Sequence, residues 1–101
     1  MMDKKMLKQA QQLQAKMLRA QEELGNATVE ATSGGGAVTV VMTGHQEVQS
    51  VKISPEVVDP EDVDLLEDMV LAALKEATQK SREMAEKKMG VLTGGLKIPG
   101  M

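Results

Sequence analysis

The sequence contains no aromatic residue, since Phe, Tyr and Trp are all missing from its 101 residues. Each such side chain would bury roughly 150 to 250 Å², so the core must be aliphatic, and burial against a second copy becomes an attractive source of stability. Nine Met residues suit such a contact because Met fills irregular gaps. The absence also excludes base stacking, which argues against binding of single-stranded nucleic acid or RNA.

Cysteine is missing as well, which excludes disulfides and thiolate metal sites. Long apolar runs are also missing. The longest extends from Met69 to Leu74, whereas a bilayer-spanning helix needs ~20 residues. Charged residues interrupt the apolar ones near the N-terminus, so we expect no signal peptide. These features predict a cytoplasmic protein, and the length predicts one domain.

Apolar residues follow a helical spacing in the first quarter of the chain. They recur every three or four positions, at Met6, Ala10, Leu13, Met17, Ala20 and Leu24. Gly25 and Asn26 then supply a stop signal. The pattern predicts a helix over 3–24.

Three segments rich in β-branched residues come next, and they predict strands over 28–33, 37–43 and 48–54. Alternation places Val38 and Val40 on one face. The connections, Gly34-Gly35-Gly36 and Gly44-His45-Gln46-Glu47, are short enough for hairpins. We therefore expect an antiparallel meander in the order 1-2-3.

The segment from Asp59 to Asp62 has the composition of a helix start, with Asp59 as N-cap and Pro60 at the first helical position. Gly90 is expected to end this helix. A second helix over 60–89 therefore completes a single domain over 1–90, and 91–101 is expected to form a mobile tail. The predicted fold class is α+β: a helix, a three-stranded antiparallel meander and a long helix.

The predicted helices are longer than the sheet that they accompany. They span about 33 and 45 Å, whereas three strands make a sheet about 15 Å wide. Apolar stripes that overhang the sheet need a partner, and a second copy related by a two-fold axis is the simplest one. We therefore expect a homodimer with projecting helical arms and an interface that includes Met6, Leu13, Met17, Val38, Val40 and Val70.

Basic residues gather in two regions although the net charge is −3. The first helix to Gln21 has a local balance of +4 and residues 75–88 have +2, while 56–68 carry −7. Screening acts over ~8 Å, so a projecting basic arm can attract phosphates despite a distant acidic block. The candidate DNA contacts are Lys4, Lys5, Lys8, Lys16, Arg19, Lys80, Arg82, Lys87 and Lys88. The alternative is that these Lys and Arg residues only solvate the outer face of surface helices, where they form ordinary i,i+4 ion pairs.

No motif indicates catalysis. The glycine triplet lacks the Lys-Ser or Lys-Thr of a phosphate-binding loop, and it joins two strands. One histidine, His45, cannot form a zinc site, and the acids of 59–68 do not match an EF-hand. We expect no catalytic residue, metal, cofactor or small-molecule substrate, and no membrane contact; His45 receives no role.

Several short segments together resemble one known family. They are Gly34–Val40, Met42–Val48, Ile53-Ser54-Pro55, Leu66–Val70 and Lys88–Leu96, the last containing Met-Gly-Val-Leu-Thr-Gly-Gly. In this order they are similar to the YbaB/EbfC family of bacterial nucleoid-associated proteins. The resemblance implies a helix, three strands, helix fold, a tweezer-like homodimer with protruding helices, and binding to double-stranded DNA in the cytoplasm or nucleoid.

Two functions therefore compete. In the leading hypothesis a homodimer binds double-stranded DNA mainly through phosphates, with broad sequence preference, because the basic residues include few suited to bidentate base contacts. In the alternative, the chain is a protein–protein adaptor or scaffold whose Met-rich helical arms dock a partner protein.

Overall fold

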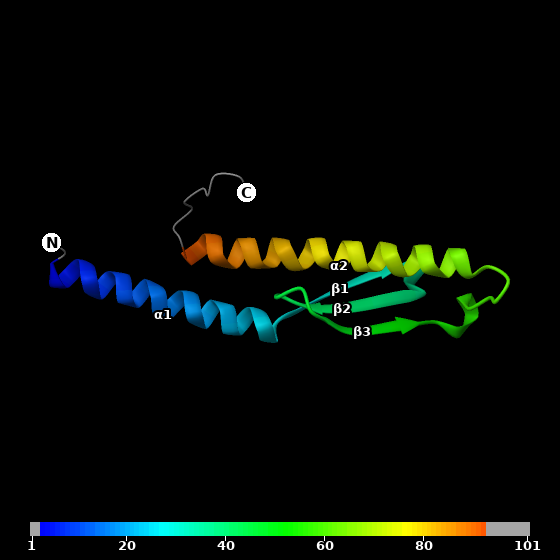
Figure 1. Cartoon of the computed structure of the whole chain (residues 1–101), viewed down its shortest axis with the longest axis horizontal. Coiled ribbons are helices and arrows are strands. Elements are labelled where there is room, and N and C mark those ends of the chain that lie inside the picture. The colour runs from blue at the N-terminus through cyan, green and yellow to red at the C-terminus, as the bar shows by residue number, and fades with distance from the viewer. Residues whose placement is uncertain (1–2, 93–101) are drawn as a thin grey trace.

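The computed structural model describes residues 3–92, which form two long helices and a small sheet (Figure 1). The elements are α1 (Lys4–Asn26), β1 (Thr28–Ser33), the 3₁₀ turn η1 (Gly34–Gly36), β2 (Val38–Thr43), β3 (Val48–Ile53), the 3₁₀ turn η2 (Pro55–Val57) and α2 (Val63–Leu92). This order confirms the predicted fold class.

The sheet is an antiparallel meander in the order β1-β2-β3, as the sequence predicts. The glycine triplet makes the first hairpin connection, and its φ angles are 62, 70 and 94°. Residues that carry a Cβ rarely adopt such positive φ angles, which explains why three glycines follow one another here. The second connection, Thr43–Glu47, follows β2 and lies beside the end of α1.

Helix α2 covers the face of the sheet formed by β1 and β2. Two alanines of α2, Ala73 and Ala77, are fully buried there and allow the helix to approach Val38 and Val40 closely. Both valines are 0% exposed within the single chain. Their side chains are therefore not available to a second copy, so we leave Val38 and Val40 out of any dimer interface.

The bounds of α2 differ from the sequence prediction at both ends. The carboxylate of Asp59 accepts a hydrogen bond from the amide of Glu61 at 2.9 Å, and its carbonyl accepts one from the amide of Asp62 at 2.9 Å. These bonds close a turn around Pro60, so the prediction that Asp59 caps the helix is wrong and α2 begins at Val63. The predicted stop at Gly90 is also wrong, because α2 continues to Leu92. The rest of the expected tail, 93–101, lies outside the described residues.

Among residues 3–92, helix α1 packs against other elements only near its own C-terminal end. The Asp3 carboxylate caps its start by accepting from the amide of Met6 at 2.8 Å. Within α1 only Ala20 and Leu24 are buried. The segment Lys4–Arg19, called the arm below, extends past the end of α2 (Figure 1), and the molecule measures 70 × 25 × 17 Å.

Gly44 is required where the turn Thr43–Glu47 meets α1. A Cβ at this position would lie 2.6 Å from the carbonyl oxygen of Leu24. We expect Gly44→Ala to destabilise the chain by about 1 to 3 kcal/mol, because backbone must shift to relieve the overlap. Thermal unfolding followed by circular dichroism measures the effect. Gly90→Ala is the matched control: its Cβ would meet no atom within 4 Å, and Ala favours a helix, so the unfolding temperature should rise.

Candidate nucleic-acid interface

The arm carries its cations along one side. Lys4, Lys5, Lys8, Lys16 and Arg19 are all exposed. At ~100° per residue these positions fall within a sector about 120° wide, beside the apolar stripe that ends in Ala20 and Leu24. We call these five residues the basic flank. The five cations and the helix that carries them were predicted from the sequence, and the helical period places the cations together.

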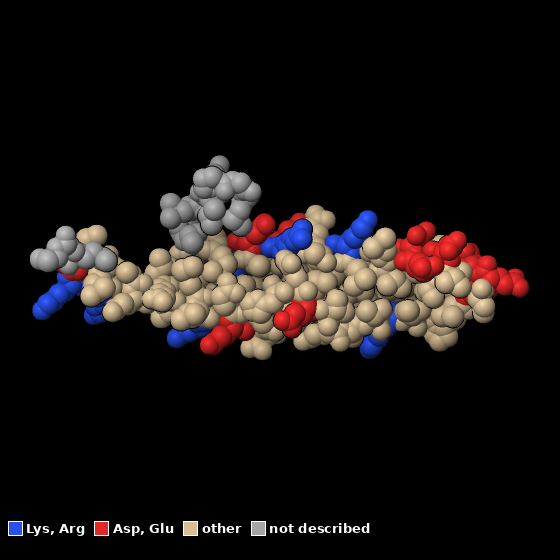
Figure 2. Space-filling view, in the orientation of Figure 1, with Lys and Arg blue, Asp and Glu red and all other residues tan. Residues whose placement is uncertain are grey.

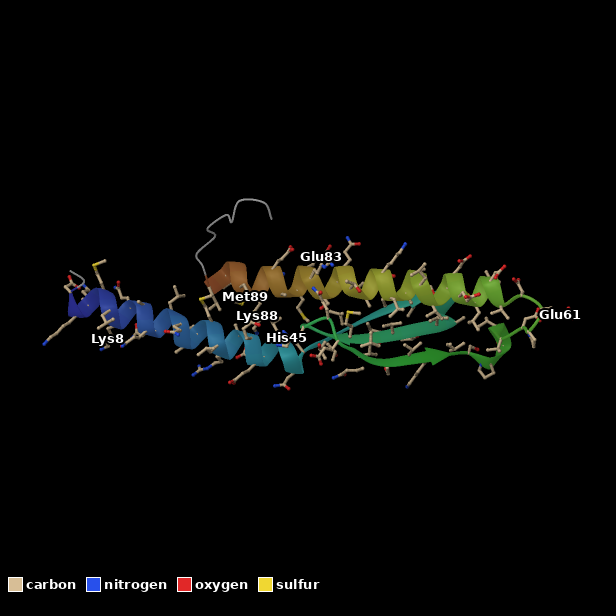
Figure 3. The ribbon with its side chains drawn as sticks, viewed as in Figure 1. Lys8, His45, Glu61, Glu83, Lys88 and Met89 are labelled. Carbon is tan, nitrogen blue, oxygen red and sulfur yellow. The ribbon has the colours of Figure 1, made fainter. Side chains whose placement is uncertain are left out.

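The acidic residues of segment 56–68 lie at the end of the molecule opposite the arm, while the other carboxylates are dispersed along it (Figure 2). The acids of segment 56–68 occupy the chain from η2 into the first turns of α2, and Figure 2 shows them gathered at the tip farthest from the arm. Glu61 marks this tip and Lys8 marks the arm, where its side chain points away from α2 (Figure 3). The long axis of 70 Å exceeds the screening length of ~8 Å several-fold. The acidic tip therefore leaves the potential around the arm nearly unchanged.

Two of the predicted DNA contacts form bonds within the chain. Lys80 pairs with Glu76 at 3.5 Å, and its Nζ donates to the carbonyl oxygen of Glu30 on β1 at 2.9 Å. Lys88 pairs with Glu23 of α1. Among residues 3–92, none of the other seven predicted cations forms an ion pair.

The pair between Lys88 and Glu23 links α2 to the base of the arm. The hydrogen bond from Lys88 and the positive charge of Lys88 hold the pKa of the Glu23 carboxyl below its ordinary value of 4.5. This link is therefore present at neutral pH and is lost as the pH falls through the lowered pKa. Both side chains are partly exposed, so the pair is a weak contribution to stability.

A cationic hollow lies between the arm and the last turns of α2. Its volume is about 330 Å³. The lining residues are Lys16, Arg19, Ala20, Glu23, Lys88, Val91 and Leu92. Three cations face one carboxylate in this hollow, which we call the fork. No spacing in the sequence indicates the fork, because it depends on how α1 and α2 pack.

The remaining predicted cations, Arg82 and Lys87, are exposed on α2. They are five residues apart, so they project about 140° from each other around the helix. The structure thus brings Lys88 together with the basic flank, whereas Lys80, Arg82 and Lys87 are dispersed over the surface of α2.

Other chemistries find little support in the part of the chain that the structure describes. Between residues 3 and 92 no three His, Cys, Asp or Glu side chains come together as metal ligands would. Neither of the two described helices combines the length and hydrophobicity of a bilayer-spanning helix.

Residues 1–96 match the model of the YbaB/EbfC DNA-binding family. The chain belongs to this family. The match confirms the resemblance seen in the sequence, and a DNA-binding family agrees with the expectation that the chain is not an enzyme.

Relatives in the YbaB/EbfC family are similar over nearly their whole length. A nucleoid-associated protein of Pelotomaculum thermopropionicum is 59% identical over 97 residues, which cover 96% of this chain and 92% of the relative. A nucleoid-associated protein of Chloroflexus aurantiacus is 53% identical over 97 residues, covering 96% and 97%.

A solved structure shares the fold. The crystal structure of an uncharacterized protein from Helicobacter pylori superposes with a TM-score of 0.79 at 20% identity. The superposition covers 93% of this chain and all of the other. It supports the fold of a helix, a three-stranded antiparallel sheet and a long helix.

Proposed function

We propose that the chain binds double-stranded DNA as a homodimer, mainly through phosphate contacts and with broad sequence preference. The observation that carries the proposal is the basic flank: five exposed cations on one side of a helix that projects from the body. Such a stripe is the usual electrostatic footprint of a nucleic-acid-binding surface. Membership of a DNA-binding family supports DNA as the bound polyanion. Relatives named as nucleoid-associated proteins support the nucleoid as the place where the chain acts.

The composition of the surface favours phosphates over bases. Four of the five residues in the basic flank are lysines, whose compact charges suit phosphate oxygens. Aromatic side chains that could stack on unpaired bases are missing from the sequence. Duplex DNA, with its dense row of phosphates, fits this surface better than a single strand does.

The homodimer is proposed from an uncovered apolar groove between β3 and α2. The groove has a volume of about 410 Å³ and is lined by Ile53, Leu66, Glu67, Val70, Leu71 and Leu74. Ile53 and Val51 stand opposite Val38 and Val40 in the strand register, so they belong to the sheet face that α2 covers. Helix α2 packs over β1 and β2 and leaves this part of the face exposed.

A second copy is the occupant that the groove fits. Strand β3 is an edge strand, so another β3 can pair with it and bring a second groove against the first across a two-fold axis. Val70 thereby stays in the proposed interface. Met6, Leu13 and Met17 lie on the apolar stripe of the arm and remain candidates for contact with the second copy.

The salt dependence of DNA binding tests the phosphate mechanism. We expect the logarithm of the affinity for a duplex to fall linearly with the logarithm of salt concentration, with a slope of roughly −4 to −7 if ~4 to 8 phosphates are neutralised. Fluorescence anisotropy of a labelled duplex at several salt concentrations measures it. A single-stranded probe of the same sequence should bind more weakly. A flat salt dependence would contradict the proposal.

A further inference from the structure

The turn Thr43–Glu47 joins β2 to β3 and holds the base of the arm through main-chain atoms. The amide of Gly44 donates to the carbonyl oxygens of Leu24 at 2.9 Å and Ala27 at 3.1 Å. Leu24 lies in the last turn of α1 and Ala27 is its C-cap residue, so neither carbonyl has a partner inside the helix. The turn therefore acts as an external cap for α1.

The side chain of His45 adds a hydrogen bond to α1 about one turn before Leu24, toward the N-terminus of the helix. Its Nε2 lies 2.7 Å from the carbonyl oxygen of Gln21. A carbonyl can only accept, so Nε2 carries the hydrogen in this contact. The ring also lies over Gly25, where a Cβ would be 3.1 and 3.2 Å from Cδ2 and Nε2. Figure 3 shows His45 at the end of α1 nearest the sheet.

The same turn is anchored to the body on its other side. The hydroxyl of Ser81, 0% exposed, donates to the carbonyl oxygen of Thr43 at 2.7 Å. The Thr43 hydroxyl in turn accepts from the amides of His45 at 3.2 Å and Glu47 at 3.3 Å. A chain of bonds thus runs from the buried centre of α2 through the turn to the main chain of α1.

Small changes at this junction are amplified along the arm. Gln21 and Lys4 are separated by about 26 Å along the helix at 1.5 Å per residue, so a tilt of about 10° displaces Lys4 by about 4 Å. Such a displacement exceeds the tolerance of a hydrogen bond to phosphate. Other side-chain contacts at the base of the arm are the partly exposed pair between Lys88 and Glu23, and the hydrogen bond that the Gln21 Nε2 donates to the Met89 Sδ at 3.9 Å.

We infer that His45 is a positioning residue, which fixes the direction of the arm through its bond to the carbonyl of Gln21. Its part in DNA binding rests on the proposed function; its effect on arm direction does not. His45 acts through the placement of the basic flank and needs no contact with DNA. The Gly-His pair in the turn thereby acquires a role: Gly44 permits the close approach and His45 sets the angle.

Intrachain distances measured by electron spin resonance test the inference. The sequence has no cysteine, so Gln11→Cys and Gln79→Cys introduce two unique sites for nitroxide labels, one on the arm and one on α2. Labelled chain is diluted into excess unlabelled chain so that only intrachain distances are recorded. The label at Gln11 lies about 15 Å along the helix from Gln21, so a tilt of about 10° moves it by about 3 Å. We expect His45→Leu to shift or broaden the distance distribution by about this amount, whereas His45→Gln, which keeps a donor at similar reach, preserves it.

DNA affinity is then measured on the same variants without labels. We expect His45→Leu to weaken duplex binding about five-fold, because DNA must then bind an arm that has lost the hydrogen bond from His45 to Gln21, worth about 1 kcal/mol. We expect His45→Gln to restore the affinity. Unchanged distances in His45→Leu would overturn the inference, whatever the affinity. Equal disturbance by His45→Leu and His45→Gln would overturn it as well. Changed distances with no duplex binding by any chain would leave the arm mechanism standing and contradict the proposed function instead.

Discussion

Reversing the charge of Lys5 and Lys8 is expected to weaken duplex binding by about 100-fold or more near 0.1 M salt, because it removes two phosphate contacts from each arm and adds two repulsive charges. Both residues lie on the exposed end of the arm, away from the bonds at its base. The slope of affinity against salt should become shallower by about 2 for each arm that contacts DNA. Anisotropy titrations with the double variant measure both effects.

The matched control reverses Lys52 and Lys75, which are exposed on β3 and α2 away from the basic flank. Because β3 is the proposed pairing strand, light scattering must show that this control has the same oligomeric state as the unchanged chain. Each reversal lowers the net charge by two, so both double variants carry −7 in place of −3. If net charge alone governed binding, the two doubles would lose the same affinity. Unimpaired duplex binding by the arm variant would favour the adaptor hypothesis, in which the arm docks a protein.

Placing a charge in the β3–α2 groove is expected to convert the proposed dimer into a monomer. Leu71 is 51% exposed in the single chain and lines the groove. Leu71→Glu therefore costs the monomer little, whereas in the dimer it buries an unpaired carboxylate, which should weaken association by about 100-fold or more. DNA affinity should fall with it, because a monomer presents one arm in place of two. Light scattering and anisotropy measure the two quantities.

Leu65→Glu is the control for this substitution. Leu65 lies on the same helix and is 52% exposed, but it does not line the groove. The two positions are six residues apart, so at about 100° per residue their side chains project about 120° from each other around the helix. A dimer that survives Leu71→Glu, or one that Leu65→Glu breaks equally well, would show that another surface joins the copies.

Much of the fold follows from local patterns. Helical spacing, β-branched segments and glycine turns predict every major element in the right order, because each pattern has a direct physical cause in the backbone. Alternation correctly put Val38 and Val40 on one face. It could not tell whether α2 or a second chain covers that face, and both side chains proved to lie in the core of the single chain. The start of α2 was misjudged because an Asp-Pro pair serves a turn as well as a helix cap.

The candidate site was predictable only where it is local. Five cations on one helix could be read from the sequence, whereas the partners of Lys80 and Lys88 come from segments far away along the chain. His45 looked like an ordinary turn residue for the same reason: its acceptor, Gln21, lies on another element. Contacts of this kind depend on the packing of α1 and α2, and no sequence spacing encodes it.

The bond from Lys80 to the backbone of Glu30 bears on how large the assembly can grow. It places the ammonium group of Lys80 against the outer strand β1, whereas β3 forms the other border of the sheet. Sheets with two open borders can recruit further molecules without limit and polymerise. If two copies pair through β3 as proposed, that pairing uses one border, and the ammonium group of Lys80 disfavours addition at the other, so we expect growth to stop at the dimer.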